Sequence, residues 1–332
     1  MKYLLYCFIS LITLAVSGQE EQVKSLINKG IQYHDSQQYD LAIKEYQKAL
    51  AIDPNSSLAN YEIAFSYLSY KDYENAELHS KKVIDSNNGH VLEAYIAYGN
   101  ALDLQGKSDK AIKAYENGIK DYDHYLLHFN HAMACFNAGK IDKAYNSAIN
   151  AINNNSSHAS SHLILSKIMD HKKSRIQAML PLYFFLMIEP DSERAGIEYE
   201  ILRKYLDQGV TKKDDKNIDV IVPFSDDTGF GAAEMMISMV KASENLEENK
   251  VKSDLELFAL HNDKIFKMLG ELKNDNTGIW WDFYVTFFYN LANENLTTPF
   301  SYYISLSQGD DSSKWLEENN QELERLAKWM QG

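Results

Sequence analysis

The residues best suited to chemistry in this chain are histidines at a repeated spacing. His124, His128 and His131 are four and three positions apart, so a helix would carry all three on one face. His158 and His162 follow the first two after 34 residues. Imidazole is a ligand for zinc and copper, and neighbouring helices could bring these side chains together. The candidate metal ligands are His124, His128, His158 and His162.

The alternative is that a repeated segment carries its histidines as helix caps or on helix faces. No cysteine or carboxylate stands beside them at the spacing typical of a metal site. A surface whose charge depends on pH through these imidazoles is a second alternative. We therefore expect no bound metal and no other cofactor.

Catalysis has few candidates. Asp227-Thr228-Gly229 matches the triplet of aspartic proteases, but that chemistry needs two carboxylates sharing a proton, and the chain has no second triplet. We expect a turn there, capping a helix that begins near Gly231. Cys135 falls on an inward helical position and is expected to be a small buried hydrophobe. A nucleophile elbow, a zinc-protease pair and a phosphate-binding glycine loop are all absent, so we do not expect an enzyme.

An internal repeat predicts the elements that position these residues. Five consecutive segments between Gln22 and Asp191 repeat one pattern every 33 to 35 residues. Small residues recur where two antiparallel helices would cross closely, and large apolar residues three and four places away would fill the space between them. Pro54 and Pro190 would end helices, because proline lacks the amide donor. The small residues are Gly30, Ala64, Gly99 and Ala132 in the first helices, and Ala42, Ala76, Ala111 and Ala144 in the second helices. The positions expected to admit the next pair are Ala49, Val83, Gly118 and Ala151.

This pattern resembles that of the tetratricopeptide repeat family over residues 22–191, about half of the chain. The clearest copy runs from Gln22 to Asn55. The resemblance implies an all-α fold, namely an α-solenoid of antiparallel helix pairs, and a non-enzymatic protein that binds a protein or peptide partner. The chain departs from the family at Asn88, which replaces the helix-ending proline, and at His128 and His131, which stand at usually apolar positions.

The resemblance also implies a groove lined by the first helix of each pair. Its residues here are unusually apolar for an exposed wall, which favours an apolar or amphipathic partner segment. Ile27 and Ile31 stand where one clamp of the family has the lysine and asparagine that hold a C-terminal carboxylate, so we expect no recognition of that kind. The alternative is that the protein's own N-terminal tail or C-terminal domain fills the groove. The expected groove residues are Ile27, Ile31, His34, Tyr61, Phe65, Leu68, Ile96, Asn100, Asp103, Phe129, Met133 and Phe136.

Residues 1–18 have the layout of a secretory signal peptide. Met1-Lys2 precedes an apolar run from Tyr3 to Val16, and Ser17-Gly18 offers a cleavage site of small residues. The run is shorter than the roughly 20 residues that span a bilayer. The alternative is an uncleaved N-terminal anchor. We expect cleavage after Gly18 and an exported protein, soluble in the periplasm or associated with the envelope, with no transmembrane segment in the mature chain.

The net charge of −14 limits the partners. Binding to nucleic acid needs a basic face that neutralises phosphates, and the sequence has no such Lys/Arg cluster. The same charge argues against purely electrostatic binding to anionic lipid. We expect a protein partner and no nucleic acid.

The repeat disappears from Ser192 onward, and residues 192–332 are expected to form an α-helical C-terminal domain that caps the last repeat. A hinge-like stretch is predicted at residues 208–227. Residues 278–293 are apolar nearly all round, which is typical of a buried central helix. The alternative is an aromatic ligand pocket around Trp280 and Trp281, although aromatic stripes at helical spacing usually fill interiors.

These observations favour a non-enzymatic scaffold of the cell envelope that holds a partner segment in the groove of the repeats. One alternative is a small-molecule-binding protein or enzyme whose site lies in the aromatic C-terminal domain. Another is a structural protein of the envelope whose repeats assemble with copies of themselves.

Overall fold

The computed structural model describes residues 2–212, 218–220, 229–246 and 249–331, with side chains from residue 18 onward except at 212, 218, 220 and 245. The contacts divide the chain into two compact units, residues 1–154 and 155–332. Over the residues whose side chains the structure describes, no helix is both long enough and apolar enough to cross a bilayer.

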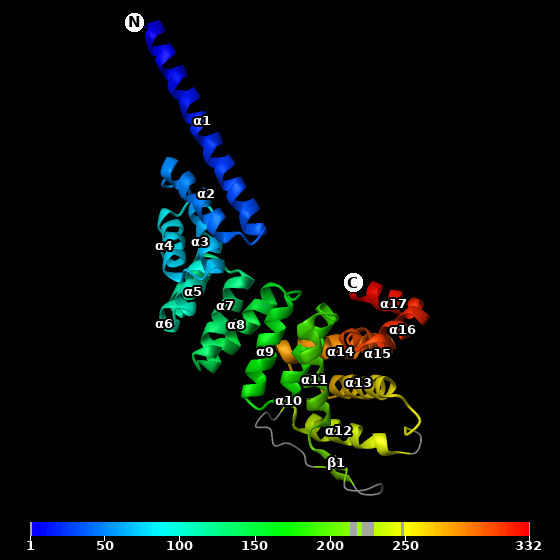
Figure 1. Ribbon diagram of the computed structural model, residues 1–332. Helices are drawn as coiled ribbons and strands as arrows, with labels where there is room; N and C mark the ends of the chain where they lie inside the picture. Colours follow the sequence, from blue (N-terminus) through cyan, green and yellow to red (C-terminus); the bar gives the residue numbers. More distant parts are fainter. Residues whose placement is uncertain (1, 213–217, 221–228, 247–248, 332) are drawn as a thin grey trace. The chain divides into compact units, whose positions relative to one another are not determined.

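The first unit is a row of antiparallel helix pairs (Figure 1). Each second helix packs on its own first helix, and α2, α4 and α6 also pack on the first helix of the next pair, which is the arrangement of an α-solenoid. The predicted all-α solenoid is confirmed in this unit. The helices are α1 (Lys2–Asp35), α2 (Tyr39–Ile52), α3 (Ser57–Tyr70), α4 (Tyr73–Ser86), α5 (Val91–Leu104), α6 (Ser108–Asp121), α7 (Tyr125–Asn137) and α8 (Ile141–Asn154).

Glycines let paired helices cross closely, as their positions in the repeat predict. The Gly30 backbone lies against the Tyr46 ring, and the Gly99 backbone lies against the Tyr115 ring, so a methyl group at either glycine would overlap the ring. Between pairs, a Cβ at Gly118 would be 3.1 Å from Cδ2 of Leu127, in the first helix of the next pair. The alanines predicted at the other crossings are fully buried. Close approach at small residues therefore fixes the register of the solenoid.

Local caps define the helix ends. The Ser56 side chain accepts a hydrogen bond from the Ala59 amide, and the Asp72 side chain accepts one from the Asn75 amide. Helix α4 has no proline after it and ends instead on Asn87, whose φ of 48° is a left-handed conformation that asparagine tolerates. Short turns between such caps hold successive helices antiparallel.

The second unit contains α9 (Ala159–His171) and α10 (Arg175–Ile188), the pair expected to form the fifth repeat. Helix α10 is enclosed: every residue from Arg175 to Leu186 is buried, and the helix packs against α9, α11, α12 and η2. A second helix in an open solenoid would keep a solvated side. This pair therefore forms the centre of the second unit.

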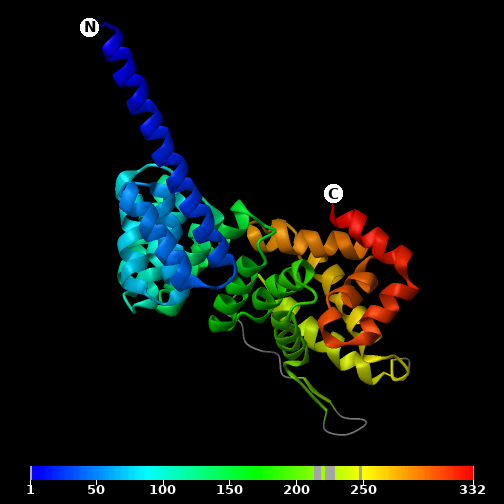
Figure 2. The ribbon, with the colours of Figure 1, turned by 45° about the horizontal axis from the view of Figure 1, so that its top comes forward.

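The rest of the second unit surrounds α10. Its C-terminal helices α16 and α17, drawn in red in Figure 2, both pack on α15. The elements are α11 (Glu193–Asp207), β1 (Val210–Lys212), β2 (Ile218–Val220), α12 (Gly231–Ala242), η1 (Ser243–Asn245), α13 (Asp254–Glu271), the π-helical η2 (Ile279–Val285), α14 (Thr286–Asn293), α15 (Thr297–Tyr303), η3 (Leu306–Gln308), α16 (Asp310–Glu318) and α17 (Asn320–Met330).

The predicted hinge at residues 208–227 falls partly outside the described residues. Within it, β1 and β2 pair antiparallel, with Val210 opposite Val220. Gly209, which precedes this pair, has a φ of 84°. Within the described part of the chain, this two-stranded ribbon is a local departure from a helical fold.

Aromatic side chains fill the core of the second unit. Tyr183 and Phe184 of α10 pack on rings from α13, η2, α14 and α15, including Phe266 and Phe288. Trp280 and Trp281 are 8% and 6% exposed, and Trp281 stacks on Phe230 with ring centroids 4.5 Å apart. These two tryptophans therefore belong to the core, as the buried-helix interpretation of residues 278–293 predicts.

Candidate functional site

The first helices of the solenoid pairs lie side by side and form one continuous face. Helix α1 contacts α3, α3 contacts α5, and α5 contacts α7. Because residues three and four apart share a side of a helix, the predicted groove residues project from the same side of this row. We call the following residues the first-helix face: Ile31 and His34 of α1, Tyr61, Phe65 and Leu68 of α3, Ile96, Asn100 and Asp103 of α5, and Phe129, Met133 and Phe136 of α7.

The prediction is wrong for Ile27. Its side chain is only 2% exposed and packs in the core with Val23, Ala42 and Tyr46. The physical reason is its spacing, since Ile27 lies four residues after Val23 and three before Gly30, and both of these are buried. Ile27 lines the inner side of a separate cleft of about 590 Å³ at the start of the solenoid.

The first-helix face presents large apolar side chains to solvent. Phe65 is 45% exposed and Met133 is 36% exposed. Phe65 stacks on the His34 ring with centroids 4.8 Å apart, and Tyr61 stacks on the ring of His90. The remaining apolar members are half-buried. An exposed apolar stripe of this kind is typical of a surface that contacts a partner.

The polar side chains of this face already make hydrogen bonds within the fold. Asn100 Oδ1 accepts a 2.7 Å hydrogen bond from the Tyr115 hydroxyl, and Asp103 Oδ1 accepts one from Ser108 Oγ. His34 Nδ1 lies 2.7 Å from Ser66 Oγ, and burial lowers the pKa of His34. These groups hold helices and turns in place, so the face offers mainly apolar contact.

Two family patterns match the solenoid. The family described as TPR repeat matches residues 30–69, and the family described as tetratricopeptide repeat matches residues 92–120. The chain carries tetratricopeptide repeats. Among curated proteins, Small glutamine-rich tetratricopeptide repeat-containing protein 2 of Mycosarcoma maydis is 32% identical over 105 residues, which is 31% of this chain. The match spans 28% of that relative's length.

Solved structures of repeat proteins are also similar. PilF of Pseudomonas aeruginosa has a TM-score of 0.49 and 18% identity, with 57% of this chain and 91% of that chain covered. YrrB, described as a TPR protein with an unusual peptide-binding site, has a TM-score of 0.44 and 19% identity, with 58% of this chain and 97% of that chain covered.

Each histidine proposed as a metal ligand contacts a group of its own. We call the first unit, residues 1–154, the TPR unit. In this unit, His128 Nε2 lies 2.7 Å from Asp123 Oδ1, and His124 Nδ1 accepts a hydrogen bond from the Leu126 amide at the start of α7. His131, on the same face, contacts Ser147. Over the residues that the structure describes, no three His, Cys, Asp or Glu side chains lie close enough to hold a metal ion.

The two later histidines belong to the second unit. His158 Nδ1 lies 2.8 Å from Ser161 Oγ. His162 is fully buried: its Nε2 donates to the Ser156 carbonyl at 2.8 Å, so its Nδ1 accepts from the Tyr284 hydroxyl at 2.7 Å. This assignment follows because a carbonyl oxygen can only accept. His162 thereby ties α9 to η2.

The residues considered for catalysis also have structural roles or lie outside the description. Asp227 and Thr228 lie outside the described residues, and α12 begins at Gly231 as the sequence predicts. Cys135 is fully buried in the TPR unit, 3.5 Å from His131 Nε2. Burial raises the pKa of its thiol to about 11, so the thiolate that reacts is scarce at neutral pH.

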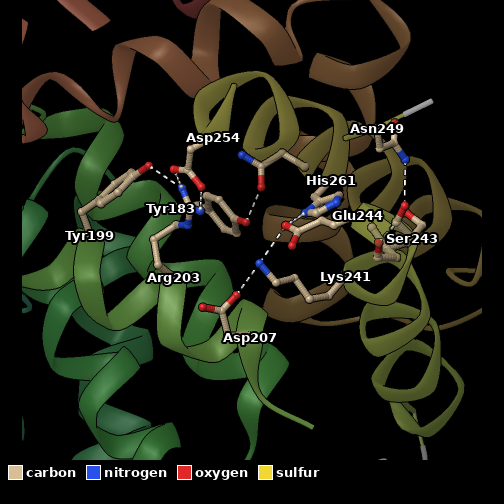
Figure 3. Close-up of polar contacts among 12 residues, drawn as sticks. Tyr183, Tyr199, Arg203, Asp207, Lys241, Ser243, Glu244, Asn249, Asp254 and His261 are labelled. Carbon is tan, nitrogen blue, oxygen red and sulfur yellow. Dashed lines mark hydrogen bonds and ion pairs between the residues drawn. The ribbon is translucent and has the colours of Figure 1, made fainter. Parts of the chain in front are cut away.

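Sequence reasoning missed a polar cluster between α11, α12 and α13 (Figure 3). Arg203 donates to both carboxylate oxygens of Asp254, at 2.7 and 2.8 Å. Lys241 pairs with Asp207 and with Glu244, each at 2.7 Å. Lys241 and Glu244 are three residues apart, but Arg203 pairs with Asp254 and Lys241 pairs with Asp207 across distant parts of the sequence, so no local spacing reveals the cluster. Since these charges are paired, the cluster holds three helices together.

Next to this cluster is a cleft of about 740 Å³. Tyr302 and Trp315 line it and stack on one another, with ring centroids 4.1 Å apart. Neither Trp280 nor Trp281 lines this cleft. The sequence-based pocket around those two tryptophans and the observed cleft are therefore different places in the second unit.

Proposed function

We propose that the protein is a non-enzymatic scaffold whose tetratricopeptide repeats hold an apolar segment of a partner protein on the first-helix face. The observation that carries this proposal is the exposure of Phe65 on α3 and Met133 on α7, the two first helices that flank α5, within a row of half-buried apolar side chains. Covering such side chains is favourable by about 25 cal/mol per Å² of apolar surface. Repeats of this kind generally mediate contacts between proteins, which agrees with the proposal.

The experiment compares Phe65→Glu with Leu78→Glu. Leu78 is 51% exposed but lies on α4, a second helix, so it is a control for added charge on an exposed apolar site. The probe is a labelled amphipathic peptide with leucine at i, i+3, i+4 and i+7 and glutamine elsewhere, followed by fluorescence anisotropy. Losing the contact of one large apolar side chain is expected to weaken binding about 10- to 100-fold.

Leu78→Glu should bind the peptide like the unchanged protein. Equal binding by Phe65→Glu, with its helical circular dichroism intact, would rule out the first-helix face. Unfolding of Phe65→Glu would instead mean that Phe65 supports the fold, and Met133→Glu then repeats the test on α7.

Within this proposal, the protein acts in the cell envelope after export. In support of this, residues 18–22 are exposed and the first buried side chain described in α1 is Val23, which lies after the proposed cut. The proposed cut lies inside α1, which continues as one helix to Asp35. Mass spectrometry of the protein from its native cells tests this: a chain starting at Gln19 supports export, and an intact N-terminus refutes cleavage.

A further inference from the structure

We propose that the partner segment on the first-helix face is cationic as well as apolar, with Lys or Arg side chains beside its apolar residues. This inference rests on the proposed function. It follows from the distribution of charge between the two kinds of helix in the TPR unit, from the surroundings of Glu62, and from the absence of a competing cation on this face.

Charge is segregated between first and second helices. Helices α3, α5 and α7 contain no Lys or Arg, whereas each of the second helices α2, α4, α6 and α8 contains at least one Lys. The carboxylates of the first helices are Glu20, Glu21 and Asp35 of α1, Glu62 of α3, and Glu93 and Asp103 of α5. A segment lying along α3, α5 and α7 would therefore meet carboxylates and no cation from these helices, which favours a positively charged partner.

Glu62 is the carboxylate whose surroundings most favour such a partner. It is half-buried on α3, between Tyr61 and Phe65 in the sequence. Burial raises the pKa of Glu62, and the nearby Asp35 of α1 raises it further. The pKa of the Tyr61 hydroxyl is raised by burial and by the negative charges of Glu62 and of Glu93 in α5. Two adjacent helices, α3 and α5, thus place negative charge beside Tyr61, and Asp35 of α1 adds negative charge near Glu62.

The contrast with Glu45 shows what Glu62 lacks. Glu45, on the second helix α2, is paired with Lys29 and Lys48, and the hydrogen bond from Lys48 is the main reason its pKa is lowered. Among the ion pairs of the described residues, none includes Glu62. A cation supplied by a bound segment would offset both the burial of Glu62 and its repulsion by Asp35.

The experiment uses three labelled peptides with leucine at the same positions and Lys, Gln or Glu at all others. Anisotropy with the unchanged protein should give the tightest binding for the Lys peptide and the weakest for the Glu peptide. Each favourable charge pair is expected to change affinity up to about fivefold. Added salt should reduce the preference, because it screens charges at the protein surface.

Glu62→Gln tests the assigned carboxylate, and Glu74→Gln is its control. Glu74 is an exposed carboxylate of α4, on a second helix. Glu62→Gln should reduce the preference for Lys over Gln several-fold and leave binding of the Gln peptide unchanged, whereas Glu74→Gln should change neither. If Glu62→Gln fails to fold, Asp35→Asn makes the same comparison.

The outcomes separate the two proposals. Equal binding of the three peptides, or a preference for the Glu peptide, overturns the cationic partner while the Phe65→Glu result still decides the scaffold function. Binding of none of the peptides overturns both. A preference for Lys that persists in Glu62→Gln and in Asp35→Asn overturns the assignment to the first-helix face.

Discussion

Adding one methyl group at Gly99 should destabilise the TPR unit. A Cβ there would lie 2.8 Å from Cδ1 of Tyr115 and would overlap Cε1 and Cζ of the same ring. The ring cannot move aside easily, because Tyr115 is 1% exposed and its hydroxyl donates to Asn100. Overpacking of this kind costs about 1–3 kcal/mol. The better helix propensity of alanine offsets about 1 kcal/mol, so Gly99→Ala should lower the unfolding free energy by up to about 2 kcal/mol.

Urea unfolding followed by circular dichroism measures this change. The control is Gly196→Ala in α11, where the nearest heavy atom would be 3.8 Å from the new Cβ, so alanine should be neutral or stabilising. Replacing the ring as well, in Gly99→Ala/Tyr115→Leu, should cost less than the sum of the two single changes, because leucine frees the space that the methyl group needs. A stabilised Gly99→Ala, or strictly additive changes, would refute close crossing at Gly99.

Two further predictions concern the second unit. Arg175 and Glu234 are both 3% exposed at the side chain, and Arg175 Nε lies 2.6 Å from Glu234 Oε2. Arg175→Met should therefore lower the unfolding free energy, measured in urea, by about 3–5 kcal/mol, and adding Glu234→Leu should restore much of this loss. If the second change restores no stability, the other contacts of Arg175 dominate. Burial lowers the pKa of His162 to about 4 from 6.5, so the unfolded chain takes up this proton first and stability should fall by about 3 kcal/mol from pH 6.5 to 4. His162→Gln should reduce this dependence of the unfolding free energy on pH, and an unchanged dependence would contradict the role assigned to His162.

The solenoid could be predicted because its determinants are local and repeated. Gly99 and Tyr115 belong to one helix pair, and Gly30 and Tyr46 repeat the same contact in another. Because the same contact recurs in successive helix pairs, the repeat in the sequence predicts this packing. The error at Ile27 was avoidable, since its spacing from Val23 and Gly30 already places it on the buried side of α1.

The second unit could be predicted only as helices, because its contacts join distant residues without a period. His162 meets Tyr284 across 122 residues, and Arg175 meets Glu234 across 59. The enclosure of α10 by later helices likewise depends on pairings that no local spacing encodes. Aromatic composition predicted a buried core around Trp281 correctly, since large rings at helical spacing fill interiors wherever the chain takes them.

The polar side chains of the first-helix face differ from Glu62 in whether they are hydrogen-bonded within the fold, and this difference bears on the proposed selectivity. Asn100 and Asp103 stand at positions that the family resemblance assigns to a partner, yet both accept hydrogen bonds from α6, the second helix of their own pair. Breaking those bonds to bind a partner would leave the buried Tyr115 hydroxyl or Ser108 unsatisfied, at a cost of about 1–3 kcal/mol for a buried group. Glu62 has no such bond among those described for the fold, so its charge is available at the face. Selectivity should therefore depend on Glu62 and the apolar side chains, and replacing Asn100 should affect folding more than binding.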